Sequence, residues 1–137
     1  NTKWLCNMEK QNYFLGCNYI IEMVSGKWKP SIICSLGVEP KRFGELRRYL
    51  LDLYGIAPAE KVLSQQLHQL IDDQIVKRTN YNTIPPKVVY SLTDRGKRLK
   101  GLLIQMAEFA ESIQDDSVNF KYSSAVMKGE AKATRQK

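Results

Sequence analysis

Several features that define large classes of proteins are scarce or absent in this sequence. No run approaches the ~18–20 consecutive apolar residues of a membrane helix, and residues 1–10 lack the apolar stretch of a secretory signal. The three cysteines, Cys6, Cys17 and Cys34, are too few and too far apart for a CxxC metal site or a disulfide scaffold. We therefore expect a cytoplasmic protein without membrane contact, whose cysteines are reduced.

Residue patterns that carry catalysis are missing as well. We find no Ser-His-Asp set, no carboxylate pair accompanied by a histidine, no glycine-rich phosphate loop and no cluster of metal ligands. His68 is the single histidine, and a lone histidine on an exposed helix position is typical of a surface residue. The sequence thus predicts no enzymatic activity, no cofactor and no metal.

What the chain does have is enough apolar sequence for a core, together with an excess of positive charge. It has 137 residues, of which 43% are hydrophobic, so we expect one compact domain. The 21 Lys and Arg outnumber the 14 Asp and Glu, and residues 27–100 alone hold 14 basic against 7 acidic side chains. Such a balance favours an anionic polymer such as nucleic acid as the partner, although many proteins are basic without binding one.

The spacing of apolar residues predicts helices before residue 75 and after residue 93. Pro30 would lie in the first turn of the second helix and Gly37 would close it, whereas Pro58 would be the first residue of the fourth. Thr93 is a suitable N-cap for the last helix. The predicted helical ranges are about 8–24, 28–37, 43–51, 58–73 and 94–113, with a connection over 52–57.

Between the last two helices the apolar pattern changes to that of strands. Residues 75–81 and 88–92 are rich in β-branched and aromatic residues, which favours a hairpin. Its tip, residues 82–87, contains Pro85-Pro86, which stiffens the tip and cannot pair. Residues 115–137 lose all periodicity and are basic, so we expect a mobile tail there.

This order of elements is that of a winged helix-turn-helix. The fold class we predict is α+β and mostly α, with a three-helix core, a two-stranded wing, and terminal helices for dimerisation. In such a fold the third core helix fits the DNA major groove while the wing reaches phosphates or the minor groove.

Four segments resemble, in order and spacing, the motifs of HxlR-type transcriptional regulators, a bacterial group related to MarR. They are Gly26-Lys27-Trp28, the basic segment 41–48 (KRFGELRR), segment 61–67 (KVLSQQL) and segment 85–93 (PPKVVYSLT). The resemblance covers about residues 17–114, preceded by a leader or helix start over 1–16. It implies a dimeric winged helix that binds a DNA operator, and hence a nucleoid-associated protein with double-stranded DNA as its partner.

The fourth helix, 58–73, is the predicted recognition helix. At 100° per residue, Leu63, Leu67 and Leu70 share one face and should anchor the helix to the core. Glutamine can pair with adenine, and serine and lysine can bind bases or phosphates. A plain solvated face would use the same residue types. The predicted DNA contacts on the opposite face are Lys61, Ser64, Gln65, His68 and Gln69.

Four further residues are predicted to contact DNA from outside the recognition helix. Arg42 and Arg48 would bind phosphates, with ordinary surface charge as the alternative. In the wing, Asn82 and Lys87 flank the stiff proline pair. Lys87 could equally be an edge lysine that prevents sheet aggregation.

A long apolar stripe on the last helix predicts self-association. A small core cannot cover all of it, so we expect it to pack on a symmetry mate and on residues 8–24, and the alternative is that both terminal helices fold back on their own subunit. The stripe comprises Leu99, Leu102, Leu103, Met106, Ala110 and Ile113.

The resemblance also implies a candidate redox switch, because some family members respond to oxidants or electrophiles through an N-terminal cysteine. Cys6 and Cys17 are the candidates, whereas Cys34 is expected to be a buried apolar residue. No small-molecule effector can be named from the sequence. The alternative function is a winged helix that binds proteins and not DNA.

Overall fold

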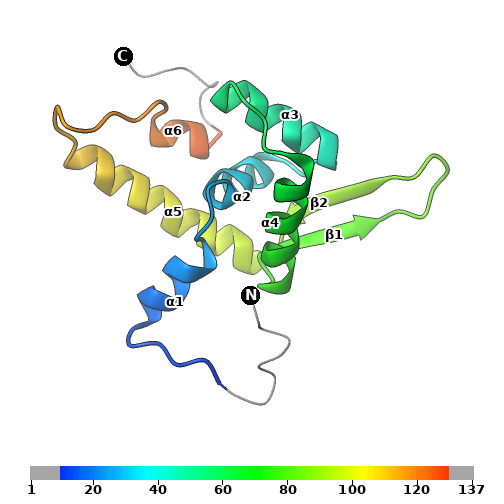
Figure 1. Ribbon diagram of the computed structural model, residues 1–137, viewed down its shortest axis with the longest axis horizontal. Coiled ribbons are helices and arrows are strands. Elements are labelled where there is room, and N and C mark those ends of the chain that lie inside the picture. Colours follow the sequence, from blue (N-terminus) through cyan, green and yellow to red (C-terminus); the bar gives the residue numbers. More distant parts are fainter. Residues whose placement is uncertain (1–9, 130–137) are drawn as a thin grey trace.

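Within residues 10–129, which the computed structural model describes, the chain forms six helices and one two-stranded antiparallel sheet. Helix α2 lies at the centre, α3, α4 and α5 pack around it, and the hairpin projects away from the body (Figure 1). This arrangement confirms the predicted winged helix fold. The elements are α1 (Gly16–Met23), α2 (Lys29–Val38), α3 (Phe43–Tyr54), α4 (Glu60–Asp72), β1 (Val76–Asn80), β2 (Val88–Leu92), α5 (Asp94–Ser112) and α6 (Ser124–Met127).

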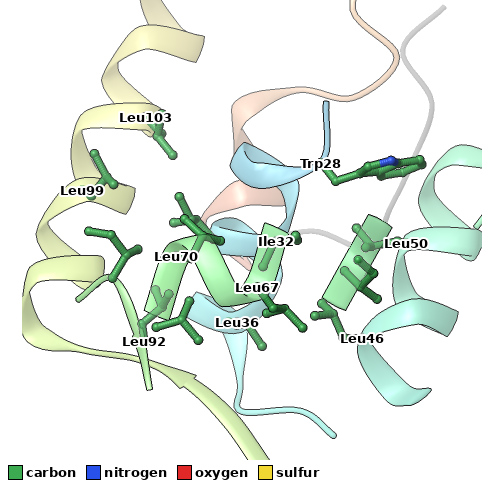
Figure 2. Close-up of a cluster of buried hydrophobic side chains, with 14 of the residues drawn as sticks. Trp28, Ile32, Leu36, Leu46, Leu50, Leu67, Leu70, Leu92, Leu99 and Leu103 are labelled. Carbon is green, nitrogen blue, oxygen red and sulfur yellow. The ribbon is translucent and has the colours of Figure 1, made fainter. Parts of the chain in front are cut away.

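The hydrophobic core forms where α2, α3, α4 and α5 meet. Trp28, which precedes α2, is buried at one edge of the core, and Leu99 and Leu103 close it from α5 (Figure 2). The side chains with almost no exposed surface are Ile32, Ile33, Leu46, Leu50, Leu63, Leu67, Leu70, Ile75 and Val76. Among the described residues, no helix combines the length and apolar character needed to cross a bilayer.

The C-terminal ends of α2 and α3 differ from the sequence prediction. Helix α2 continues past Gly37 to Val38, and Gly37 faces Lys100 of α5: a Cβ at Gly37 would lie 2.4 Å from that side chain. Helix α3 continues to Tyr54 and ends at Gly55, which adopts the left-handed conformation with φ 79°. The predicted connection over 52–57 is therefore too long.

The start of α4 also differs, since Pro58 is not its first residue. Ala59 is the N-cap and Glu60 the first helical residue. The carbonyl oxygen of Pro58 accepts a hydrogen bond from Arg47 Nε at 2.9 Å, so Pro58 is held as part of the preceding turn. A side chain of α3 therefore fixes Pro58 and, with it, the start of α4.

Helix α1 is shorter than predicted. Residues 10–15 are not helical, and Leu15 has extended backbone angles as the N-cap of a helix that begins at Gly16. The remainder of the predicted range, from Met8, lies outside the described residues.

The hairpin forms as predicted and is fastened to the body by a contact that was not predicted. β1 and β2 pair in the register Val76↔Leu92 to Asn80↔Val88. Lys41 pairs with Tyr90 of β2 through two backbone hydrogen bonds of 3.0 and 2.8 Å. This isolated bridge joins the base of the hairpin to the residues just before α3.

Helix α5 begins at the predicted cap. Thr93 Oγ1 accepts a hydrogen bond from the Gly96 N–H at 3.0 Å. Gly96 is required by close packing, because a Cβ there would lie 2.2 Å from the carbonyl oxygen of Ile75. The start of α5 is therefore locked against the start of β1.

The C-terminal segment differs from the expected tail over the residues that the structure describes. Residues 120–127 are half-buried and include the short helix α6, and Met127 packs on the core. Tyr122 Oη donates a hydrogen bond to the carbonyl oxygen of Leu53 at 2.6 Å. The apolar and aromatic residues of this segment explain the folding back. Residues 130–137 of the expected tail lie outside the described range.

Candidate nucleic-acid interface

Helix α4 presents the two faces that its sequence predicts. Leu63, Leu67 and Leu70 are fully buried, which anchors the helix along its whole length. Gln69 is only half exposed, so of the predicted contacts it is the least accessible. The exposed residues of the opposite face are Lys61, Val62, Ser64, Gln65 and His68.

The exposed face of α4 carries groups suited to reading base edges. Gln65 has both a donor and an acceptor in one amide, and Ser64 adds a hydroxyl. His68 is well exposed and lies 3.7 Å from Asp72, one turn further along the helix. The carboxylate of Asp72 makes the C-terminal end of α4 less suited to phosphates.

The position of α4 depends on Gln66, whose role the sequence analysis missed. Gln66 Oε1 accepts a hydrogen bond from the backbone N–H of Trp28 at 3.2 Å, so the helix is tied to the start of α2. Gly26 permits this contact: a Cβ there would lie 3.3 Å from the same oxygen. On the helical wheel Gln66 lies beside the leucine stripe, and that signal could have marked it as inward-facing.

Two arginines hold the ends of α4. Arg47 binds the Pro58 carbonyl before the helix, and Arg95 Nη1 donates to the Asp73 carbonyl oxygen at 3.1 Å after it. Arg47 is half-buried in this contact. These bonds orient the recognition helix without using its exposed face.

Arg42 and Arg48 are exposed, as phosphate contacts need to be. The backbone N–H of Arg42 donates to Glu45 Oε1 at 2.7 Å, which caps α3 and leaves the guanidinium outside the cap. Lys41, by contrast, is buried, and its Nζ donates to the Ser35 carbonyl oxygen at 2.7 Å. Burial lowers the pKa of Lys41. Its role is therefore structural.

The wing tip is exposed and internally braced. Asn82 and Lys87 are both accessible, and Asn82 takes a positive φ of 54°, which asparagine tolerates better than most residues. Lys87 Nζ lies 4.7 Å from the centre of the Tyr81 ring. Ile84, which sequence reasoning did not single out, is fully exposed at the tip. β1 adds exposed Lys77 and Arg78.

Comparison with known proteins decides the family. The HxlR-like helix-turn-helix family matches residues 23–118. The chain belongs to this family. Among curated proteins, the HTH-type transcriptional regulator YtcD of Bacillus subtilis (strain 168) is 38% identical over 96 residues, which cover 70% of this chain and 72% of YtcD. The protein is accordingly a transcriptional regulator with a helix-turn-helix fold, and not an enzyme.

Solved structures of family members agree with the fold. The redox regulator HypR in its reduced form is 35% identical, with a TM-score of 0.65, and the match covers 74% of this chain and 95% of HypR. HypR in its oxidised form matches with a TM-score of 0.62. The reduced form of YodB, a transcriptional regulator from B. subtilis, is 25% identical, with a TM-score of 0.65 over 75% of this chain and 97% of YodB.

The cysteines of this family member lie in contrasting environments. Cys17 is exposed in the first turn of α1, whereas Cys34 is largely buried in α2. Burial raises the pKa of the Cys34 thiol to about 11. Cys34 therefore stays a neutral thiol at physiological pH. Cys6 lies outside the described residues.

Proposed function

We propose that this regulator is a sequence-specific double-stranded DNA-binding protein that acts as a homodimer on a roughly palindromic operator. Helix α4 would enter the major groove, and the wing tip, residues 82–87, would lie on the backbone or in the minor groove. The observation that carries the proposal is the exposed polar face of α4 above three fully buried leucines.

The proposed DNA contacts divide into those that read bases and those that bind the backbone. Ser64, Gln65 and His68 stand out from α4 and are assigned to base edges, with the half-exposed Gln69 as a further contact. The phosphate contacts we assign are Lys61, Arg42, Arg48, Asn82 and Lys87, which are all exposed.

The homodimer is supported by apolar surface that this subunit leaves uncovered. Leu99 and Leu103 of the α5 stripe are buried in the core, but Leu102, Met106 and Ile113 are exposed. α1 and the residues before it add Phe14, Leu15 and Ile21, which are also exposed. A second copy that covers this face would place two recognition helices to meet half-sites about one DNA turn, ~34 Å, apart.

A redox response is the finer part of this proposal. The oxidised and reduced structures of the redox regulator HypR support the idea that a cysteine of such a regulator changes oxidation state. In this chain Cys17 is exposed and lies next to the proposed dimer face, so its modification could alter the pairing of two subunits. Cys6 remains the second candidate from the sequence.

The test begins with selection of bound sequences from random duplexes. Gln65→Ala should then cost about 1–3 kcal/mol at one base position and little elsewhere, measured by fluorescence anisotropy on single-base variants of the selected site. Gln105→Ala, which removes an exposed glutamine of α5, is the matched control. Arg48→Ala should weaken binding to every sequence by a similar factor.

Two results would contradict DNA binding. One is a failure to enrich any sequence; the other is affinity that does not fall as salt rises, because phosphate neutralisation makes protein–DNA binding strongly salt-dependent. A salt-insensitive complex with another protein would instead support the interaction module.

The redox part has its own test. We expect alkylation or diamide oxidation to weaken operator binding of the wild type at least several-fold, and Cys17→Ser or Cys6→Ser to remove the response. Unchanged operator affinity after complete modification of both thiols would overturn it while leaving DNA binding intact.

A further inference from the structure

Outside the DNA-binding face, a cavity of about 270 Å³ lies between the helical body and the C-terminal segment. Its floor comes from α2 and α3, with Cys34, Tyr49 and Leu53, and its wall from Ala107 of α5. Protein interiors contain few voids larger than one water molecule. A cavity of this size approaches the ~300 Å³ at which small-molecule sites begin.

The C-terminal segment covers this cavity as a lid. Tyr122 Oη donates to the Leu53 carbonyl oxygen at 2.6 Å, and Ser124 binds both carboxylate oxygens of Glu111, through its N–H at 2.6 Å and its hydroxyl at 2.8 Å. Lys128 pairs with Glu108 at 3.0 Å. The lid is fastened by its polar groups, and its apolar side chains Val126 and Met127 line the cavity.

The lid lies almost entirely beyond the part of the chain that matches the family, which ends at residue 118. The cavity is therefore completed by residues that the DNA-binding body does not require. In Figure 1 the segment that bears α6 runs back from the far end of α5 toward α2, and α6 contacts both helices.

The chemistry of the lining selects one class of occupant. Most of the lining is apolar. It includes the rings of Tyr49, Tyr54 and Tyr122, which suit a ligand that contains an aromatic ring. The hydroxyls of Ser31 and Tyr54 are hydrogen-bonded to each other, and that of Ser35 is bonded to the Ser31 carbonyl. The polar groups of the lining are thus largely satisfied within the protein.

Lys121 supplies the remaining recognition element. Among the described residues that line the cavity it alone carries a charge, and no described carboxylate pairs with it; its Nζ lies 5.6 Å from the centre of the Tyr122 ring. A cation at the rim of an apolar cavity complements a molecule with an apolar body and one anionic end.

We propose that this cavity binds a small aryl carboxylate, with its ring among the tyrosines and its carboxylate on Lys121. The proposal goes beyond DNA binding and does not rest on it. Cys34, in the floor, has a pKa raised by burial and reacts slowly, through a small thiolate fraction, so its rate of alkylation can report whether the cavity is occupied.

The test uses 3-phenylpropanoate and its neutral analogue 3-phenylpropan-1-ol with the full chain, by isothermal titration calorimetry without DNA. We expect the acid to bind with a Kd in the micromolar to millimolar range and the alcohol to bind about tenfold more weakly. Lys121→Gln should reduce the difference between them to within about twofold, whereas Lys97→Gln, at an exposed position of α5, should preserve it.

Filling the cavity gives the second arm. Ala107→Phe should weaken binding of the acid at least tenfold, and Ala110→Phe, one turn further along α5 and outside the cavity, should not. Circular dichroism checks that both variants fold. In the wild type, the acid should slow alkylation of Cys34 by N-ethylmaleimide several-fold and leave that of the exposed Cys17 unchanged. This protection experiment needs no variant.

Each contrary result overturns a stated part of the proposal. Absence of binding, or binding without protection of Cys34, shows that the cavity is not the site. Equal affinity for the acid and the alcohol, with no effect of Lys121→Gln, shows that Lys121 does not recognise a carboxylate. Because no readout contains DNA, failure here and failure of the proposed operator binding are distinguishable.

Discussion

Helices α4 and α5 are both amphipathic, but the faces that they expose differ in chemistry. α4 buries its leucines and exposes amide, hydroxyl and imidazole groups. α5 buries Leu99 and Leu103, yet also exposes apolar side chains, among them Phe109 at 65% and Met106 at 55%. A polar face is well solvated without a partner, whereas covering an apolar face of this extent lowers the free energy of the protein. The two helices therefore point to two kinds of partner.

The largest expected effect comes from the buried side of α4. Leu67→Ala should lower the free energy of unfolding by about 2–5 kcal/mol, because it leaves a cavity under the helix. Val62→Ala, on the exposed side of the same helix, should change it by less than about 0.5 kcal/mol. Urea unfolding followed by circular dichroism measures both. Equal losses would mean that α4 does not have two distinct faces.

The apolar face of α5 is tested next. Met106→Glu should raise the Kd for self-association by ~100-fold or more, roughly 3 kcal/mol, because a charge would be buried in the interface. Sedimentation velocity would follow the shift from dimer to monomer. Ser64→Glu adds the same charge to the polar face of α4 and should leave the mass unchanged. A dimer that survives Met106→Glu would show that this face is not the interface.

The buried thiol gives a pH-dependent contrast with the exposed one. The pKa of Cys34 is raised from 9.0 to about 11 in the folded protein, so as pH rises the unfolded chain loses its proton first. The stabilisation is complete below about pH 9 and is lost as pH approaches 11. Between about pH 8 and about pH 10.5, the wild type should lose about 2 kcal/mol more than Cys34→Ala. Cys17→Ala should lose as much as the wild type; an equal loss in Cys34→Ala would refute the assignment.

The smallest expected effect separates two adjacent glutamines. Gln66→Ala leaves the Trp28 N–H without its acceptor and should cost about 1 kcal/mol of stability. Gln65→Ala should leave stability within about 0.5 kcal/mol and act only on the choice of base. The pair is measured by urea unfolding and by anisotropy on the selected duplex. Should Gln65→Ala destabilise the fold, its side chain would be structural.

Local patterns were sufficient to predict much of this molecule. The two strands, the Thr93 cap and the leucine anchor of α4 follow from periodicity and capping preferences, which depend on nearby residues. Where a glycine or proline served packing, the same rules misplaced the boundary: Gly37 was taken as a stop but accommodates Lys100, and Pro58 as a start but accepts from Arg47.

What could not be predicted are contacts between residues far apart in the sequence. Gln66 reaches Trp28 across 38 positions, and Tyr122 reaches Leu53 across 69. No periodic pattern of one element encodes its distance from another, so the ties that orient α4 and the cover over the cavity emerge only in the folded chain. Apart from the half-exposed Gln69, the predicted DNA contacts are exposed, and their binding stays a prediction.

The bridge between Lys41 and Tyr90 affects how well a given DNA duplex would fit between the wing and α4. It joins the wing to the residues before α3, and α3 in turn holds Pro58, in the turn that leads into α4, through Arg47. These contacts therefore constrain the spacing between the wing and α4 before any DNA is bound. A duplex whose groove already fits this gap loses little entropy on docking, whereas a mismatched one must bend, and the cost depends on its base steps.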